Sequence, residues 1–375
     1  MAQTPSPSFL DHFSQIDDPR VNRRRRHKLL DILFIALCAT ICGADDFLAI
    51  EVWGRARRDW LQQYLELPNG IPSHDTFNRV FQALDPQQFL QCFRQWVQPL
   101  CESLGVKLIA VDGKTARATL DRKKQKNPLH VVSAWASEAH LLLGQMAVDE
   151  KSNEITAVPR LLELLDLHGA IVTLDALCCQ KEIAATIRDR GGHYLLAVKG
   201  NQEHLEEDIM AGFAAEEAKV HNQISRVTTH DQGHGRIERR VVETMPVPAL
   251  VRNQESWKDL TSIGRVTRTY QEKGEEKSEV RYFISSAASK PKLFGQAVRG
   301  HWGVENGLHW TLDMYFGEDR HRARAGNAAE NMALLRRWVL SLLRHDTTVK
   351  GSVPKKRYKA TLDVEILEKI LHIDQ

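Results

Sequence analysis

Paired cysteines, long apolar runs and secretion signals are missing from this sequence, and each absence excludes a class of protein. Its six cysteines show neither a disulfide framework nor the Cys/His spacing of a zinc finger. The longest apolar stretch, residues 29–43, contains Asp31 and is too short to cross a bilayer. Residues 1–8 have no signal-peptide core. We therefore expect a reduced, cytoplasmic protein with no membrane partner.

The net charge of +3 excludes little, but the basic residues are clustered. Residues 320–360 hold eleven Lys and Arg against two acids, and residues 107–127 hold seven against two. Residues 23–28 form a third cluster. Separated basic clusters on a nearly neutral chain favour a polyanionic partner, because each neutralised phosphate releases counterions. Ordinary solvated surface charge is the alternative.

Residues 1–104 have a helical pattern throughout. Apolar residues at three- and four-residue steps predict helices over residues 9–18, 28–42, 45–65, 73–83 and 85–104. We expect Ser73 to cap the fourth of these helices. The turn before it is also typical of a helix-turn-helix recognition helix, with Arg79 among the outward groups. An ordinary packing helix is the alternative.

The periodicity changes after residue 105. Strand-like runs alternate with helical ones, which predicts a mixed α/β sheet. We expect strands over 107–112, 129–137, 140–148, 170–175 and 193–198, helices over 154–167, 179–190 and 201–215, and a basic connection over 113–128. A β-rich insertion follows at about 220–285, then helices over 291–316 and 327–343. The predicted domains are a helical N-terminal domain (1–104), a catalytic domain (105–346) and a basic C-terminal tail (347–375).

Two of the predicted buried strands end in aspartate. The run from Leu108 ends at Asp112, and Gly113 is then expected to turn the chain; the run from Ala170 ends at Asp175. Two carboxylates delivered to one sheet edge could share a divalent metal ion. Each could instead cap the turn or helix that follows it.

A late helical segment supplies candidates for a third carboxylate. Glu305, His309 and Asp313 follow at four-residue steps and could line one helix face. An all-oxygen site suits Mg²⁺ or Mn²⁺, and two such ions roughly 4 Å apart could activate a water or 3′-hydroxyl in phosphoryl transfer. Glu305 and Asp313 are the rival candidates for the third ligand. A carboxylate pair could also indicate a glycosidase, but a neutral sugar would gain nothing from the basic clusters.

Six motifs then carry a family resemblance. They are Ala110-Val-Asp-Gly-Lys-Thr115, Lys151-Ser-Asn-Glu-Ile155, Thr173-Leu-Asp-Ala-Leu-Cys-Cys-Gln180, Leu196-Ala-Val-Lys-Gly-Asn-Gln202, His234-Gly-Arg-Ile-Glu-Arg239 and His301-Trp-Gly-Val-Glu-Asn306 with Leu308-His-Trp-Thr-Leu-Asp313. In this order the chain resembles, over nearly its whole length, the DDE insertion-sequence transposases of the ISAs-one type, also called H-repeat-associated proteins. The resemblance implies a ribonuclease-H-like core with a β-rich insertion, an N-terminal associated domain and a metal triad at Asp112, Asp175 and Glu305.

The chain departs from related transposases around the last acid. They carry Tyr-x₂-Arg-x₃-Glu-x₆-Lys, whereas this sequence has Val298, His301, Glu305 and Leu312 at those positions. The phosphate-handling work of the missing residues would pass to Arg299, His301 or His309.

Further basic residues are candidates for contact with DNA. Lys114 follows Asp112, Lys199 follows a strand end, and the others lie in the insertion or just past the site: Arg236, Arg239, Arg322 and Arg324. Ordinary exposed positions are the alternative for Lys114, Arg236 and Arg239. Asn201 is expected to cap a helix, and Trp302 and Trp310 are expected in the core.

The sequence therefore predicts a transposase that binds double-stranded DNA at the inverted repeats of its element. It would cut phosphodiester bonds with metal-activated water and join the freed 3′-hydroxyl to target DNA, using two Mg²⁺ or Mn²⁺ ions. Binding of two ends implies a homodimer, and the family implies a bacterial, nucleoid-associated protein. The alternatives are a DNA-binding relic that has lost transposition and a metal-dependent nuclease that cuts without joining.

Overall fold

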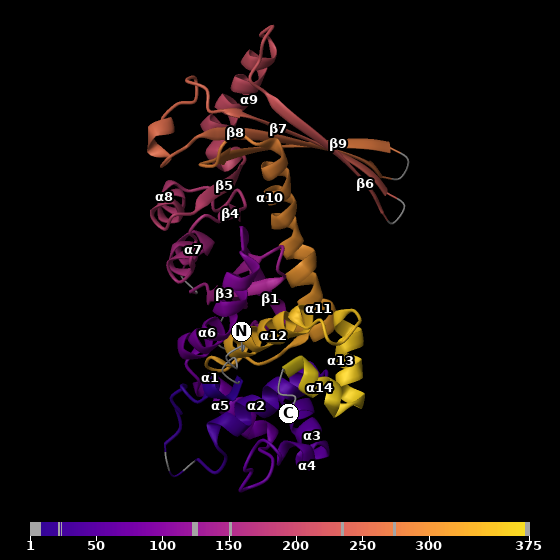
Figure 1. Cartoon of the computed structure of the whole chain (residues 1–375). Helices are drawn as coiled ribbons and strands as arrows, with labels where there is room; N and C mark the ends of the chain where they lie inside the picture. The colour runs from indigo at the N-terminus through magenta and orange to yellow at the C-terminus, as the bar shows by residue number, and fades with distance from the viewer. Residues whose placement is uncertain are drawn as a thin grey trace, which may run out of the picture.

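The computed structural model of the chain describes residues 9–21, 23, 25–121, 127–149, 152–233, 236–272 and 275–371. Figure 1 shows an elongated molecule, in which helices from both ends of the chain gather at one end and an extension of the sheet lies at the other. Within these ranges no helix combines the length and apolar character that a membrane span requires.

One nine-stranded sheet runs through the molecule in the order β3-β2-β1-β4-β5-β9-β8-β7-β6. Its strands are β1 (Leu108–Ala116), β2 (Leu129–Ala136), β3 (Leu141–Ala147), β4 (Ile171–Leu174), β5 (His193–Val198), β6 (Ser225–Gly233), β7 (Arg236–Pro246), β8 (Ser262–Glu272) and β9 (Glu275–Ser285). β1, β4 and β5 are parallel, and the other neighbours pair antiparallel. Helices α7 (Glu154–Glu163), α8 (Lys181–Asp189) and α9 (Glu203–Glu217) follow β3, β4 and β5. The predicted mixed α/β class is confirmed.

β1 is longer than the sequence predicted. The expected turn at Gly113 is wrong, since β1 continues to Ala116 and Gly113 pairs with Val132 of β2. Glycine is needed there for space, because a Cβ on Gly113 would overlap the side chains of Glu154 and His130. Residues 122–126, the most basic part of the predicted connection, lie outside the described residues.

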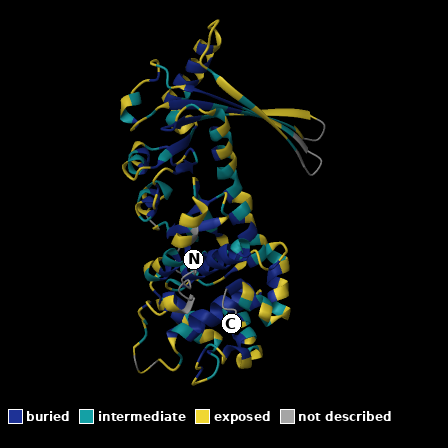
Figure 2. Cartoon of the chain, viewed as in Figure 1, coloured by how far each residue is buried: buried dark blue, intermediate teal, exposed yellow. Residues whose placement is uncertain are grey.

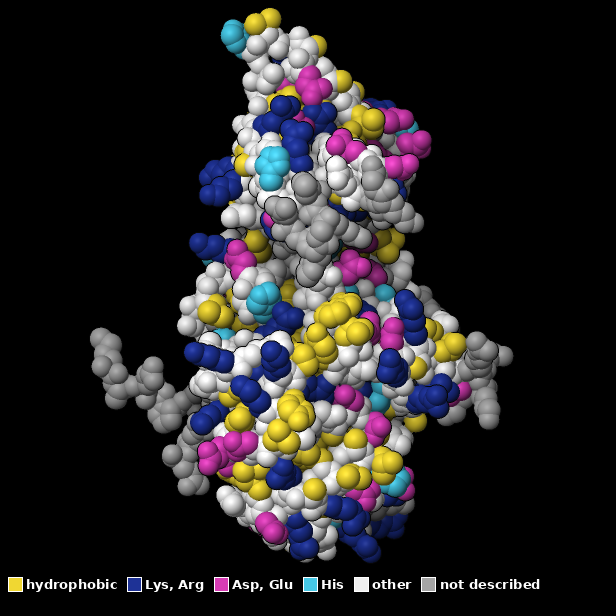
Figure 3. All heavy atoms as spheres, turned by 90° about the vertical axis from the view of Figure 1, so that its right-hand side faces the viewer, with side chains coloured by type: hydrophobic (Ala, Val, Ile, Leu, Met, Phe, Trp, Pro, Cys, Tyr) yellow, Lys and Arg dark blue, Asp and Glu magenta, His cyan; other side chains and the backbone are white. Residues whose placement is uncertain are grey.

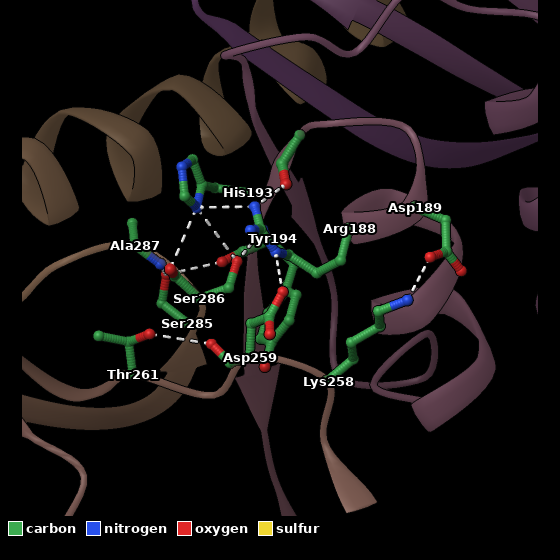
Figure 4. A network of polar contacts seen from close by, with 11 residues as sticks. Arg188, Asp189, His193, Tyr194, Lys258, Asp259, Thr261, Ser285, Ser286 and Ala287 are labelled. Carbon is green, nitrogen blue, oxygen red and sulfur yellow. Dashed lines mark hydrogen bonds and ion pairs between the residues drawn. The ribbon is translucent and has the colours of Figure 1, made fainter.

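The β-rich segment predicted at 220–285 extends the same sheet. β9 pairs antiparallel with β5, and β8, β7 and β6 follow outward from it. Polar contacts fix this junction: Arg188 of α8 donates to the Asp259 carboxylate (2.9 Å), and His193 Nδ1 lies 3.1 Å from the Ser286 carbonyl oxygen (Figure 4). The far ends of these strands are exposed, whereas buried residues fill the central strands and the helical end (Figure 2).

The helical end combines both ends of the chain. Its N-terminal helices are α1 (Phe9–Phe13), α2 (Leu29–Ile41), α3 (Phe47–Ala56), α4 (Arg58–Leu61), α5 (His74–Ala83) and α6 (Pro86–Leu104). Its later helices are α11 (Trp310–Phe316), α12 (Ala328–His345), α13 (Val353–Leu362) and α14 (Val364–Leu371). α10 (Pro291–Val304) leads to them along the sheet. The predicted tail therefore contains two helices, α13 and α14.

The N-terminal helices and α12 share one hydrophobic core. Trp338 of α12 is fully buried and packs edge-on against Phe13 and Phe93, both with ring centroids 5.2 Å away. Asn331 of α12 donates to the Phe81 carbonyl oxygen of α5 (2.9 Å). Residues from the first hundred and the last fifty positions thus stabilise each other.

Four of the basic residues between 320 and 360 are inside this core rather than on the surface. Arg336, Arg337, Lys356 and Arg357 are all buried. Arg337 pairs with the buried Glu318, and Lys356 with the buried Asp346 (2.9 Å). A buried charge requires such a partner. This part of the charge run therefore serves the fold, which the sequence pattern did not indicate.

α5, the possible recognition helix, packs its apolar face into the core. Phe77, Val80 and Phe81 are buried, while Arg79 is exposed. Ser73 occupies the N-cap position without making the expected side-chain cap. The Glu51 carboxylate instead accepts from the His74 backbone N–H (2.6 Å), which satisfies the first turn of the helix.

Candidate active site

Asp112 and Asp175 lie side by side on neighbouring parallel strands. Ala110 of β1 pairs with Thr173 of β4, and each aspartate stands two residues further along. Residues two apart on a strand share a face, and parallel strands keep their register. The sheet therefore brings the two predicted carboxylates together, although β1 continues beyond Asp112.

Asp112 has an environment that disfavours its charge. Its side chain is 27% exposed, and burial raises the pKa of its carboxyl to about 7. The negative charges of Glu154, Asp175 and Glu305 raise the pKa further, while a hydrogen bond from the Gly113 N–H to Oδ1 (2.9 Å) opposes the shift. Three neighbouring carboxylates thus act on Asp112 at this edge of the sheet.

Asp175 makes a local hydrogen bond as well. Its Oδ1 accepts from the Cys178 N–H (3.2 Å), so the turn-capping alternative also describes its role. The second oxygen is left for other partners. His301 lies beside it: burial lowers the pKa of His301, and the neighbouring Asp175 charge opposes that shift. His301 Nδ1 is 3.1 Å from the Thr173 hydroxyl, which places this imidazole against β4.

Glu305 comes from a helix that crosses the sheet. α10 runs from the β6–β9 end of the molecule towards the helical end, in contact with β1 and β4 (Figure 1). It continues as a π-helical turn over Glu305–His309 before α11 begins. Such turns re-aim side chains and are frequent at functional sites. Glu305 is exposed on this turn, and its charge reaches Asp112.

The π-helical turn is held by specific donors. Arg344 of α12 donates to the Gly307 carbonyl oxygen (2.6 Å), and the Thr311 hydroxyl donates to the Asn306 carbonyl oxygen (3.2 Å). These bonds satisfy carbonyl groups that a change of helical register leaves without their usual partners. The position of Glu305 thus depends on α12.

His309 is nine-tenths buried and faces the carboxylates. Its Nδ1 lies 3.6 Å from Asp112 Oδ2, beyond hydrogen-bond distance, and among the described residues its Nε2 has no partner. Burial, together with the charges of Arg337 and Lys114, lowers the pKa of His309 to about 3. The imidazole is therefore neutral at pH 7.

Asp313, the rival third ligand, is paired with a cation. Lys114 Nζ donates to Asp313 Oδ2 (2.6 Å) and lies 3.9 Å from Asp319 Oδ1. The Lys114 side chain is only 9% exposed. In this structure Lys114 joins β1 to α11, and contact with a phosphate would require the pair to open.

The other predicted DNA contacts are spread over the surface. Lys199 is exposed beside a cavity of about 60 Å³ that Asp175 and His301 also line. Arg299 pairs with Asp231 (2.9 Å), and Arg324 donates to the Ala118 carbonyl oxygen (3.2 Å). Two more side chains, those of Arg239 and Arg322, are exposed. The side chain of Arg236 and all of His234 lie outside the described residues.

Three further expectations are wrong. Trp310 is 49% exposed rather than in the core. Trp302 is half-buried, with the Arg281 guanidinium 4.2 Å above its ring. Asn201 does not cap a helix; its amide donates to the Ala176 carbonyl oxygen (2.7 Å) and joins the loops after β4 and β5.

Glu154 is the neighbour of the site that sequence reasoning missed. Its carboxylate oxygen, the Asp175 carboxylate and the Cys178 thiol lie within 4.8 Å of one another. The motif Lys151–Ile155 contains Glu154, but nothing in its spacing connects it with Asp112 or Asp175. Only the folded sheet does so.

The donor set fits a hard divalent cation. Carboxylate oxygens are the ligands that Mg²⁺ and Mn²⁺ prefer, and a thiol is a poor one. Burial and the neighbouring carboxylates raise the pKa of Cys178, so its sulfur stays protonated. The mutual repulsion that raises the pKa of Asp112 would be relieved by a bound cation.

Comparison with known proteins identifies the family of the chain. A family model described as a transposase DDE domain matches residues 105–342, and a model of the associated N-terminal region matches residues 10–97. The chain belongs to the DDE transposase family. The predicted resemblance is thereby confirmed.

Relatives in the DDE transposase family match nearly end to end. "Putative transposase YncI" of Escherichia coli O157:H7 is 40% identical over 97% of this chain and 94% of its own. "H repeat-associated putative transposase YhhI" of E. coli K12 is 39% identical over 97% of both chains. A shorter protein, "Inactive transposase YbfQ" of the same strain, is 44% identical over 19% of this chain and 86% of its own. A cryo-EM structure of a piggyBac transposase synaptic complex with hairpin DNA is similar over 97% of this chain and 80% of that one. Its TM-score is 0.43 at 10% identity, and this likeness carries no argument.

Proposed function

We propose that this member of the DDE transposase family is an active, metal-dependent DNA transposase with a ribonuclease-H-like core. The observation that carries the proposal is the register of β1 and β4, which sets Asp112 beside Asp175 with the charge of Glu305 within reach. The strand order β3-β2-β1-β4-β5, with only β2 antiparallel to its neighbours, also matches the core that the family resemblance implies.

Asp112, Asp175 and Glu305 would hold Mg²⁺ or Mn²⁺, in a pair of ions. When bound, these ions supply an activated water or 3′-hydroxyl and neutralise charge on the leaving oxygen. The protein supplies the rest: β1 and β4 fix two carboxylates in a rigid sheet, and α12 holds the turn that presents Glu305. The neutral His309 is placed to donate or accept a hydrogen bond beside Asp112.

The proposed substrate is double-stranded DNA at the element's inverted repeats and at the target. Lys199 is the predicted cation that is exposed next to Asp175. A second cavity, of about 250 Å³ between α10 and β6–β9, is lined by Arg240, Arg268, Arg281, Lys292 and Arg299. Several of these cations already pair with acids, for example Arg268 with Glu238 (2.7 Å). On the face shown in Figure 3, Lys and Arg are likewise interspersed with Asp and Glu. DNA would therefore bind along selected cations rather than one continuous basic surface.

A plasmid-nicking assay tests the metal site. Supercoiled plasmid containing candidate inverted repeats is incubated with Mg²⁺ or Mn²⁺ and with wild type, Asp112→Ala, Glu305→Ala or Asp313→Asn. We expect wild type and Asp313→Asn to nick and the two alanine variants to lose at least 10²-fold in rate. Equal nicking by all four proteins would reject the site. Loss in Asp313→Asn but not in Glu305→Ala would reassign the third ligand.

Product analysis separates the alternatives. A transposase joins the cut 3′-end to a labelled target duplex, whereas a nuclease releases it. The relative YbfQ is named an inactive transposase, so a DNA-binding relic is one of the alternatives. Such a relic would bind inverted repeats in an end-labelled shift assay and nick no plasmid. Because an active complex must hold two ends, we also propose a homodimer on DNA. In the bacterial cell the protein would then be cytoplasmic and associated with the nucleoid.

A further inference from the structure

Glu154 is held in a fixed orientation at the edge of the proposed site. It lies in the first turn of α7, and its Oε1 is 2.7 Å from His130 Nε2 on β2. The other ring nitrogen of His130 is 2.7 Å from the Thr115 hydroxyl of β1. The chain Thr115–His130–Glu154 thus uses three elements to aim one carboxylate. Outer-shell partners of this kind are typical of carboxylates that serve a metal.

The Glu154 carboxylate lies close to Asp175, and its charge reaches Asp112. Glu154 Oε2 lies 3.9 Å from Cys178 Sγ, and one oxygen each of Glu154 and Asp175 lie within 4.8 Å. Glycine at position 113 makes this possible, since any side chain there would occupy the space of the Glu154 carboxylate. Gly113, which follows Asp112 in β1, therefore leaves the space that the Glu154 carboxylate fills.

A buried imidazole lies beside Asp112. His309 is nine-tenths buried, its Nδ1 is 3.6 Å from Asp112 Oδ2 without a hydrogen bond, and among the described residues its Nε2 has no partner. In the described part of the chain, no Lys or Arg forms an ion pair with Asp112, Asp175 or Glu154. Carboxylates this close together, with no Lys or Arg paired to them, would be stabilised by a cation from solution, as they are by a proton.

We infer that Glu154, oriented by His130 and Thr115, is a fourth carboxylate of the divalent-cation site at Asp112 and Asp175. This inference rests on the proposed function, because it takes the metal site as given. The competing explanation is that Glu154 is only the structural partner of His130. The two differ in whether Glu154 contributes to cation affinity.

Mn²⁺ binding by the full-length protein without DNA decides between them. Free Mn²⁺ is followed by its electron paramagnetic resonance signal for wild type, Asp175→Asn, Glu154→Gln and Glu163→Gln. Glu163 is the matched control, since it is an exposed glutamate of the same helix α7. We expect Glu154→Gln to raise the Kd for Mn²⁺ at least tenfold, the scale on which even outer-shell partners act, and Glu163→Gln to leave it unchanged.

The possible outcomes distinguish failure of this inference from failure of the proposed function. If Asp175→Asn loses Mn²⁺ affinity while Glu154→Gln keeps that of wild type, the metal site stands and Glu154 is not part of it. If wild type itself binds no Mn²⁺, the proposed function and the inference are both wrong. Should Glu154→Gln not fold, Glu154→Asp keeps the charge but withdraws it by one methylene. An unchanged Kd in that variant would equally overturn the inference.

Discussion

At the scale of single residues, burial and then neighbouring carboxylates disfavour a charged Asp112. Asp112 is disfavoured as an anion by burial and by the charges of Glu154, Asp175 and Glu305, and its pKa rises to about 7. The unfolded chain would ionise Asp112 near pH 4. Between these two values the native state binds more protons than the unfolded state, so stability falls as pH rises through this window.

The substitution Asp112→Asn should therefore stabilise the metal-free protein. At pH 8 we expect a gain of about 2–4 kcal/mol in the free energy of unfolding, shrinking to near zero at pH 4. Urea titrations at both pH values in EDTA would measure it, with the exposed Asp59→Asn as control. Adding Mn²⁺ should stabilise wild type and not the variant. Parallel pH curves for wild type and Asp112→Asn would contradict the assignment.

Lys114 offers a second test at this scale, because the sequence suggested a contact with DNA and the structure shows an ion pair with Asp313. Lys114→Met leaves the Asp313 carboxylate without its cation and should cost about 2–4 kcal/mol. In a double-mutant cycle with Asp313→Leu, the double variant should lose less than the sum of the single losses. Additive losses, combined with weaker DNA binding by Lys114→Met alone, would favour the DNA contact instead.

At the scale of elements, the π-helical turn is what presents Glu305. Arg344→Met removes the donor to the Gly307 carbonyl oxygen and should cost about 1–3 kcal/mol. Because the turn would relax, we also expect slower nicking with unchanged DNA affinity. Arg320→Met, an exposed control, should change neither. Loss of stability with full nicking activity would show that Glu305 does not depend on this bond.

Features that depend on residues adjacent in the sequence could be predicted, whereas features that depend on residues distant in the sequence could not. The strand at 193–198 and the strand end before Asp175 are local patterns that the sequence predicts correctly, whereas β1 continues past Asp112. Gly113 was read as a turn, since its reason for being glycine lies in Glu154, which is 41 residues away in the chain and adjacent only in the fold. The π-helical turn has no local signature for the same reason, since Arg344 holds it from another helix.

At the scale of the whole molecule, the two ends of the chain depend on one another. The sequence suggested a separate N-terminal domain over residues 1–104, whereas the described helices of that region share their core with α12. Trp338 lies among Phe13, Phe89 and Phe93, and Arg357 of α13 donates to the Thr40 carbonyl oxygen of α2 (2.9 Å). The charge run at 320–360 has the same explanation, because its buried members hold these helices together.

Residues 105–375 should therefore not fold alone. Without α1 to α6, the indole of Trp338 and the apolar face of α12 would be exposed to water, a loss of several large buried side chains worth about 1.5–3 kcal/mol each. We expect the fragment to aggregate or to bind the dye ANS strongly, and co-expression with residues 1–104 to restore a soluble complex. In the full chain, Trp338→Ala should lower a single unfolding transition by about 3–5 kcal/mol. Two separate transitions, of which only one responds to Trp338→Ala, would instead establish that the N-terminal helices fold independently.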